Sequence, residues 1–251
     1  MKKNQVKNLL LISFILIVII GVVFIFYLLS SKKATFKPFT IVSKTEQIAS
    51  TVIEDTPAVG WIRVQGTNID YPIIYETPNA YNSGLDYTWI SHTPEGEENR
   101  MAIYGHNIQN VSAKPLTNDQ NQKRFEQLMS FVYKDFAKNN LYIQYSHNGI
   151  DELYKIYAVS FFDKDEDRGK VTKTKIETDN YIKGAKEKSL YKYAVEVDSN
   201  DKIISLITCT RYFGDKSKTQ FKVDARLVRS NEKPDEYTVQ TTSNYDIIKE
   251  K

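Results

Sequence analysis

The sequence predicts a mostly β protein, in which a closed or nearly closed barrel of seven or eight strands carries two or three peripheral helices. Two observations lead to this fold class. Short runs of strand-forming residues alternate with turn residues between Gly60 and Val228. The first 31 residues contain one long uncharged stretch, which leaves about 220 residues for a single outer domain.

The uncharged stretch, Leu9–Leu29, holds 21 residues. About 20 apolar residues span a bilayer as a helix, and no small-residue cleavage site follows, so we expect an uncleaved, single-pass transmembrane anchor. The head before it is too short to fold, so we expect the N-terminus in the cytoplasm and the remainder outside the cell. The expected segments are a head at 1–8, the anchor at 9–29, a stalk and N-terminal helix at 30–57, the main domain at 58–230 and a loose polar tail at 231–251.

The charge of the outer domain excludes one class of partner. The chain has 34 basic and 31 acidic residues, and three of the basic ones precede the anchor, where no acid occurs. The remainder therefore carries no formal net charge. A nucleic-acid partner would need a basic face, so none is expected.

The elements of the first half follow from turn residues and periodicity. Ser43–Glu54 is expected to form a short amphipathic helix. Two strands follow within 60–75, separated by the turn Gln65–Asn68, and Pro72 places the second at an edge or a bulge. A third strand ends at Gly105, and apolar spacing predicts a helix over 122–138. The run 141–162 is typical of a hairpin with a type I′ turn at Asn148-Gly149.

The second half is expected to begin with a charged loop over 163–175. Thr178 or Asp179 would then cap a helix that runs to Leu190. The runs 202–209 and 221–228 are strong strands, and the alternation of apolar and charged residues in the second predicts a strand buried on one face only.

Cys209, at the end of an apolar strand, is the only cysteine. In an exported domain a single thiol cannot form an internal disulfide, so it is a reactive group, a partner for an intermolecular bond, or a small buried hydrophobe. A reactive thiol needs a base, because the thiolate is the nucleophile. His106 follows the glycine of a tight strand exit and is the best-placed imidazole, whereas His92 and His147 lie in a polar loop and a hairpin turn. One cysteine and three scattered histidines do not give the spacing of a zinc site, so no metal is expected.

Four segments of the sequence carry a family resemblance: the cysteine strand "SLITCT", the histidine motif "IYGHN", the opening strands "GWIRVQGTNIDYPIIY" and the segment before the histidine, "SGLDYTW". Together they resemble the corresponding segments of sortases, the membrane-anchored cysteine transpeptidases of Gram-positive bacteria. The helical region "YIKGAKEKSLYKYAVEV" before the cysteine strand is similar to class B sortases. The resemblance covers residues 59–228 and would make 58–230 a sortase catalytic domain.

The resemblance implies an eight-stranded barrel with Cys209 as nucleophile and His106 as acid/base. The thiolate would cleave a C-terminal sorting signal of the L-P-x-T-G or N-P-x-T-N type after Thr. It would pass the acyl group to an amine of the cell-wall precursor, and no cofactor is implied. The family also has an arginine on the last strand, but Gln220 stands at the matching position. Arg211, Gln220 and Arg226 are the candidates for the missing transition-state stabiliser, and Arg211 is favoured because it follows the cysteine closely.

Three alternatives stay open at this point. A pilus polymerase would use the same chemistry with a pilin lysine as acceptor. A catalytically impaired surface-binding module would keep the barrel, which the loss of the arginine favours. A cysteine protease would differ only in using water to resolve the acyl-enzyme.

Overall fold

The structure is a computed structural model that describes residues 12–22, 37–76, 88–90, 98–107, 124–167, 171–214 and 218–248. The chain divides into two units, Met1–Lys37 and Pro38–Lys251. The described part of the first unit is a helix over 12–22 with exposed apolar side chains. No helix among the described residues combines the length and the apolarity that a membrane span requires. Residues 9–11 and 23–29 of the expected anchor lie outside the described residues.

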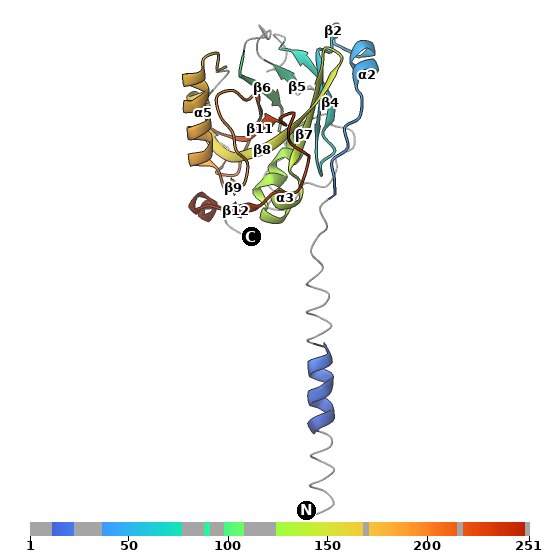
Figure 1. Cartoon of the computed structure of the whole chain (residues 1–251), viewed down its shortest axis with the longest axis vertical. Helices are drawn as coiled ribbons and strands as arrows, with labels where there is room; N and C mark the ends of the chain where they lie inside the picture. The colour runs from blue at the N-terminus through green and yellow to red at the C-terminus, as the bar shows by residue number, and fades with distance from the viewer. Residues whose placement is uncertain are drawn as a thin grey trace, which may run out of the picture. The chain divides into compact units, whose positions relative to one another are not determined.

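The second unit is built on a closed barrel (Figure 1), which confirms the predicted fold class. Its strand order is β10-β11-β8-β7-β3-β4-β5-β6. Most neighbours are antiparallel, but β4–β5 and β6–β10 are parallel pairs. The strands are β3 (Gly60–Val64), β4 (Asp70–Tyr75), β5 (Thr88–Ile90), β6 (Arg100–Gly105), β7 (Tyr142–His147), β8 (Ile150–Asp163), β10 (Ile203–Cys209) and β11 (Thr219–Leu227).

The predicted turns are confirmed, and one strand prediction is wrong. Asn148 and Gly149 both have positive φ, at 49° and 74°, as a type I′ hairpin requires. Gly66 in the first turn has φ 76°. Pro72, however, lies inside β4 with β3 on one side and β5 on the other, so it marks neither an edge nor a bulge. It is tolerated because the pairing with β5 starts one residue later, at Ile73.

The helices differ from the prediction mainly at their ends. The first, α2 (Thr45–Ser50), stops early because Val52–Ile53 (β1) pairs with Thr56–Pro57 (β2). The helix expected over 122–138 is instead a 3₁₀ helix, η1 (Glu126–Val132), followed by α3 (Lys134–Asn139). A short helix, α4 (Lys164–Asp167), occupies part of the expected charged loop.

The long helix α5 (Lys175–Lys188) begins before the predicted caps. Thr174 is its N-cap and forms a capping box with Glu177. Thr178 therefore lies inside the first turn, where it is fully buried.

The core fills the barrel and extends beneath α5. The side chains of Ile62, Ile103 and Leu206 have no exposed surface. The outer face of β11 is buried too, because Tyr181 of α5 packs on Lys222 and donates a hydrogen bond of 2.5 Å to Asp224. The expectation that β11 is buried on one face only is therefore wrong.

Both ends of the second unit pack on the barrel. The side chain of Gln144 accepts from the amide of Val42 at 3.1 Å and donates to its carbonyl at 2.6 Å. Val42, which belongs to the expected stalk, is therefore bound to β7 of the barrel. The expected loose tail is also wrong, because Val239–Thr241 (β12) pairs with Tyr191–Tyr193 (β9). The hydroxyl of Tyr237 donates to the carbonyls of Leu141 and Ile156, at 2.6 and 2.9 Å. A final 3₁₀ helix, η2, spans Ser243–Ile247.

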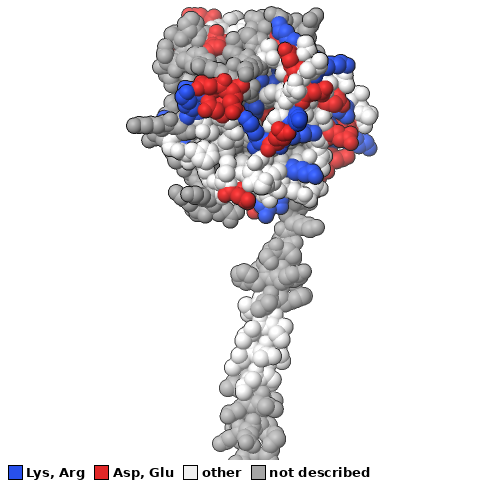
Figure 2. Space-filling model, turned by 90° about the vertical axis from the view of Figure 1, so that its left-hand side faces the viewer, with Lys and Arg blue, Asp and Glu red and all other residues white. Residues whose placement is uncertain are grey.

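One face of this unit carries charges of both signs (Figure 2). Figure 2 shows acidic and basic side chains interspersed on the face that it presents. This pattern agrees with the balanced charge of the outer domain.

Candidate active site

Two parallel strands bring the predicted nucleophile and the predicted base together. Strands β6 and β10 pair in register up to Gly105 and Thr208. His106 follows Gly105 and Cys209 follows Thr208, so these two residues lie side by side at the same end of the barrel although they are 103 positions apart in the chain. The thiol is exposed, as a nucleophile must be.

Hydrogen bonds fix the backbone on both sides of this pair. Thr208 Oγ1 donates to the carbonyl of Gly105 at 2.8 Å. Asn107 Nδ2 donates to the carbonyl of Cys209 at 2.9 Å. Hydrogen bonds therefore join the two segments just before and just after the thiol and the imidazole. Such bonds hold reacting groups in place.

Close packing explains why a glycine precedes His106. A Cβ atom on Gly105 would lie 2.5 Å from Cγ of the buried Phe125. The amide of Phe125 donates to the carbonyl of His106 at 2.8 Å. Phe125 thus binds the backbone of His106, and only a glycine at position 105 leaves room for the Phe125 ring.

The imidazole of His106 packs against an aromatic wall. Its ring centroid lies 4.9 Å from that of Trp89 on β5, with 50° between the ring planes. Trp89 is itself buried and stacks on Tyr104. This contact restricts the orientation of the imidazole beside the thiol.

Gln220 lies directly opposite Cys209 in the antiparallel pair of β10 and β11. Its side-chain Nε2 donates toward the sulfur at 3.9 Å. The register therefore places Gln220 next to the thiol. Gln220 occupies the position at which a sortase arginine is expected. An amide N–H at this position can donate to a charge that develops on the substrate carbonyl, but it carries no positive charge itself.

The other two candidates occupy different places. Arg226 pairs with Ile203, at the opposite end of β10 from Cys209, and is buried in two hydrogen bonds of 2.5 Å to Glu232. The structure therefore does not bring Arg226 to the thiol. Arg211 is half-buried in the turn after β10, where its carbonyl accepts from the amide of Gly214 at 2.9 Å. The aromatic residues of this turn pack on Phe161 of β8.

A cavity of about 680 Å³ lies between α5 and the barrel, close to this site. Phe162, which pairs with Gln220, and Lys222, two residues further along β11, both line it. The Lys222 ammonium lies 4.9 Å from the ring centroid of Phe162 and 4.6 Å from that of Tyr181. The cavity is therefore partly aromatic, and its lining reaches the residue that pairs with Gln220.

The remaining histidines are not at this site. His147 lies at the far end of the barrel, where it stacks on Tyr145 and bonds to Glu152. His92 lies outside the described residues. Sequence reasoning assigned no role to Asn107, Trp89 or Phe125. Asn107 could have been proposed as a site residue, because it directly follows the histidine.

A comparison with protein families matches residues 62–228 to the sortase domain. The chain belongs to the sortase family. Its curated relatives include sortase B of Listeria monocytogenes, which is 26% identical over 167 residues, or 60% of this chain and 62% of the relative. The matched region thus spans less than two thirds of that relative's length.

Solved structures of sortase B share the fold. Sortase B of Staphylococcus aureus aligns with a TM-score of 0.58 at 17% identity, over 82% of this chain and 93% of the other. A mutant form of Clostridium perfringens sortase B aligns with a TM-score of 0.57 at 24% identity, over 68% of this chain and 82% of the other. These structures show the shared fold, and the curated sortase B relative makes the chain class B-like within the sortase family.

Proposed function

We propose that this chain is a sortase that cleaves a C-terminal sorting signal of the L-P-x-T-G or N-P-x-T-N type after Thr and joins the acyl fragment to an amine of the cell-wall precursor. The observation that carries the proposal is the juxtaposition of an exposed Cys209 with His106 across the parallel strands β10 and β6. A thiol and an imidazole so placed are the two groups that acyl transfer by a cysteine requires.

The reaction proceeds in two steps. The thiolate of Cys209 attacks the carbonyl carbon of the substrate Thr, and the bond to the following residue breaks as His106 gives a proton to the leaving amine. The product is a thioester on Cys209. The acceptor amine then attacks the thioester carbon, loses its proton to His106, and releases the thiolate together with the new amide.

Gln220 supports the first step as a hydrogen-bond donor. Its Nε2 already points at the sulfur, so it lies beside the carbonyl oxygen that becomes negative during attack. We assign the substrate residues that precede the Thr to the cavity beneath α5, because Phe162 of its lining pairs with Gln220. Arg211 remains a second candidate donor, because it lies only two residues beyond the nucleophile.

Two classes of acceptor amine fit the proposal. Sortase B of Staphylococcus aureus has been solved in complex with a substrate and, separately, with triglycine. A sortase B from the type II pilus of Streptococcus pneumoniae has a similar fold. A cell-wall amine is our first choice, and a pilin lysine is the alternative.

We also propose that the apolar run Leu9–Leu29 anchors the chain in the cell membrane with residues 38–251 outside. The support is its length and lack of charge, which suit a bilayer span. Protease added to intact cells should digest the outer unit and leave the head protected.

The test of the proposed activity is a peptide assay with the two sorting motifs, with and without triglycine. Mass spectrometry should find the fragment that ends in Thr joined to triglycine when the amine is present. A protease would give only the hydrolysed fragment in both cases. An impaired binding module would bind the peptide and leave it intact.

A further inference from the structure

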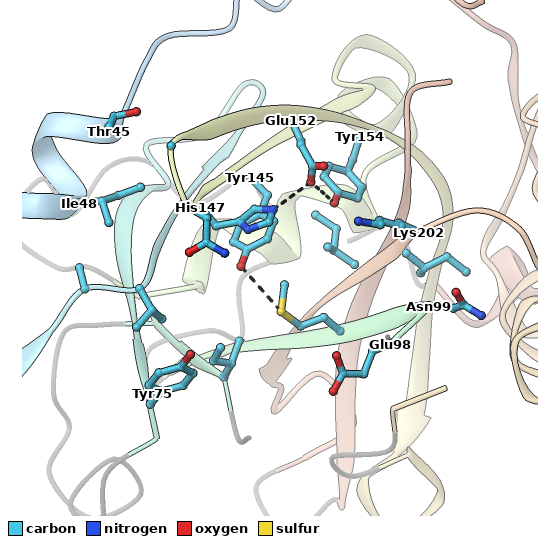
Figure 3. A pocket seen from close by; sticks show the side chains of 18 of the residues that line it. Thr45, Ile48, Tyr75, Glu98, Asn99, Tyr145, His147, Glu152, Tyr154 and Lys202 are labelled. Carbon is cyan, nitrogen blue, oxygen red and sulfur yellow. Dashed lines mark hydrogen bonds and ion pairs between the residues drawn. The ribbon is translucent and has the colours of Figure 1, made fainter. Parts of the chain in front are cut away.

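A second cavity lies at the opposite end of the barrel from the thiol (Figure 3). Its volume is about 520 Å³, within the range of pockets that hold small molecules. Ile203 and Ile204, the first residues of β10, line it, and Cys209 ends the same strand. Six residues of strand put the cavity roughly 20 Å from the thiol, so it is separate from the proposed active site.

The polar wall of this cavity holds a carboxylate with one oxygen still available. His147 Nε2 and the hydroxyl of Tyr154 both bond to Oε2 of Glu152, at 3.2 and 2.7 Å. Oε1 of Glu152 has no hydrogen-bond partner among the described residues, although the side chain is only 14% exposed. A carboxylate oxygen so enclosed is a ready acceptor for a ligand N–H group.

The carboxylate is held in its charged form. Burial alone would raise the pKa of Glu152, but the hydrogen bonds from His147 and Tyr154, together with the nearby charge of Lys202, outweigh it and keep that pKa below its ordinary value. Glu152 is therefore negative at neutral pH, and a cation is the charge that it would stabilise.

Aromatic and apolar groups form the rest of the wall. The Tyr145 ring stacks on His147 with centroids 4.6 Å apart, and its hydroxyl donates to the sulfur of Met101 at 3.8 Å. Tyr75 and Ile48 line the side nearer α2. Aromatic faces attract cations, and the aliphatic groups accept a hydrocarbon body.

Two further charged groups bound the cavity. Figure 3 shows Glu98 on the side opposite Glu152 and Lys202 near Tyr154. Lys202 is an exposed residue, so water stabilises its ammonium. The lining thus carries the carboxylates of Glu98 and Glu152 and the exposed ammonium of Lys202, and Glu152 Oε1 is the oxygen that faces a positively charged ligand.

We propose that this cavity binds a primary ammonium group on a compact apolar body, with the ammonium donating to Glu152 Oε1. The ligand class is that of small apolar amines and amino-acid amides. This site is distinct from the place at Cys209 where the acceptor amine of the proposed reaction would attack.

Calorimetric titration of the full-length protein in mild detergent tests the proposal with three probes of equal shape. Leucinamide carries the ammonium alone, leucine adds a carboxylate, and 4-methylpentanoate carries the carboxylate alone. Leucinamide should bind more tightly than leucine, and 4-methylpentanoate should not bind. Equal binding of leucinamide and 4-methylpentanoate, or no binding of leucinamide, would overturn the proposal.

Three variants locate the site. Glu152→Gln keeps an acceptor for His147 and Tyr154 but removes the charge, and it should weaken leucinamide binding at least tenfold. Glu187→Gln, on the exposed face of α5, should leave binding unchanged. Ala49→Trp, on the α2 side of the cavity, should abolish binding by filling it.

A separate variant distinguishes this site from the active site. Cys209→Ala should bind leucinamide as the natural protein does, whatever becomes of its peptide cleavage. Loss of binding in Cys209→Ala together with full binding in Glu152→Gln would place the amine at the thiol and contradict the inference.

Discussion

Gln220 faces Cys209 across the β10–β11 pair, with its side-chain Nε2 3.9 Å from the sulfur. If this amide stabilises the developing oxyanion, its removal should slow acylation. Loss of one such donor lowers rates by about 100-fold. We expect a fall of this order in Gln220→Ala, measured as the initial rate of sorting-peptide cleavage. Gln240→Ala, exposed on β12, is the matched control and should cleave at the natural rate.

Arg211 provides the competing explanation for the missing arginine. If Arg211 is the donor, Arg211→Ala should show the large loss of rate and Gln220→Ala only a small one. The same peptide assay, with substrate-binding affinity measured separately, decides between the two residues. Equal and negligible effects of both variants would mean that neither stabilises the transition state.

Glu232 should make the stability of the domain depend on acid pH. Its hydrogen bonds from Arg226 hold the pKa of its carboxyl at about 2, below the ordinary value of 4.5. A carboxyl with a lowered folded-state pKa contributes stability that is complete above pH 4.5 and is lost as the pH falls toward 2. Glu232→Gln leaves the buried Arg226 without its counter-charge, which should lower the free energy of unfolding by about 3 kcal/mol near pH 7.

Urea unfolding of both proteins between pH 7 and pH 2.5 measures this difference. We expect the gap between natural protein and Glu232→Gln to narrow as the pH falls. Glu236→Gln, at an exposed position of the same segment, should show no gap at any pH. A gap that stays constant down to pH 2.5 would show that the ion pair is not its source.

Gly105 should not tolerate a side chain. The added methyl group of Gly105→Ala would meet the ring of Phe125 and displace the backbone beside His106. Overpacking of this kind lowers stability by about 1–3 kcal/mol, and cleavage should fall as well. Gly184→Ala on α5 is the control, because nothing lies within 4 Å of its new methyl group. A stable and fully active Gly105→Ala would refute the close packing described for this strand exit.

The C-terminal segment should stabilise the barrel through Tyr237. Tyr237→Phe removes a hydroxyl that donates to two carbonyls, so we expect the free energy of unfolding to fall by about 1–2 kcal/mol. Tyr193→Phe is the matched control, since its buried hydroxyl has no hydrogen-bond partner among the described residues and its loss should be neutral or stabilising. If urea unfolding gave the same result for both variants, the tail would not act through this hydroxyl.

The barrel strands could be predicted because the patterns that mark each strand lie within the strand and its turns. Apolar alternation and turn residues such as Asn148-Gly149 mark strands without reference to the rest of the fold. Pro72 and the outer face of β11 could not be judged in this way. Whether a proline lies at an edge, or a charged face is covered, depends on which neighbour packs there, and α5 lies 31 or more residues away from β11 in the chain.

The site could be predicted only in part for a related reason. Cys209 stood out as the only cysteine, and His106 as the histidine at a strand exit. Counting residues along the last strand then placed Gln220 at the arginine position, and the register agrees. Trp89 and Phe125 act through contacts with a strand that is distant in sequence, so no local pattern marks them. Thr174 was missed because its capping box lies in a stretch that is charged like a loop.

The most direct test of the account is to trap the acyl-enzyme. The protein is mixed with a sorting peptide in the absence of an acceptor amine, quenched in acid and analysed by intact-protein mass spectrometry. We predict a mass increase equal to the fragment that ends in Thr, located on Cys209 by peptide mapping. The adduct should be discharged by triglycine, absent from Cys209→Ala and formed at least 100-fold more slowly in His106→Ala. Cleavage of the peptide by Cys209→Ala at the natural rate would contradict the account.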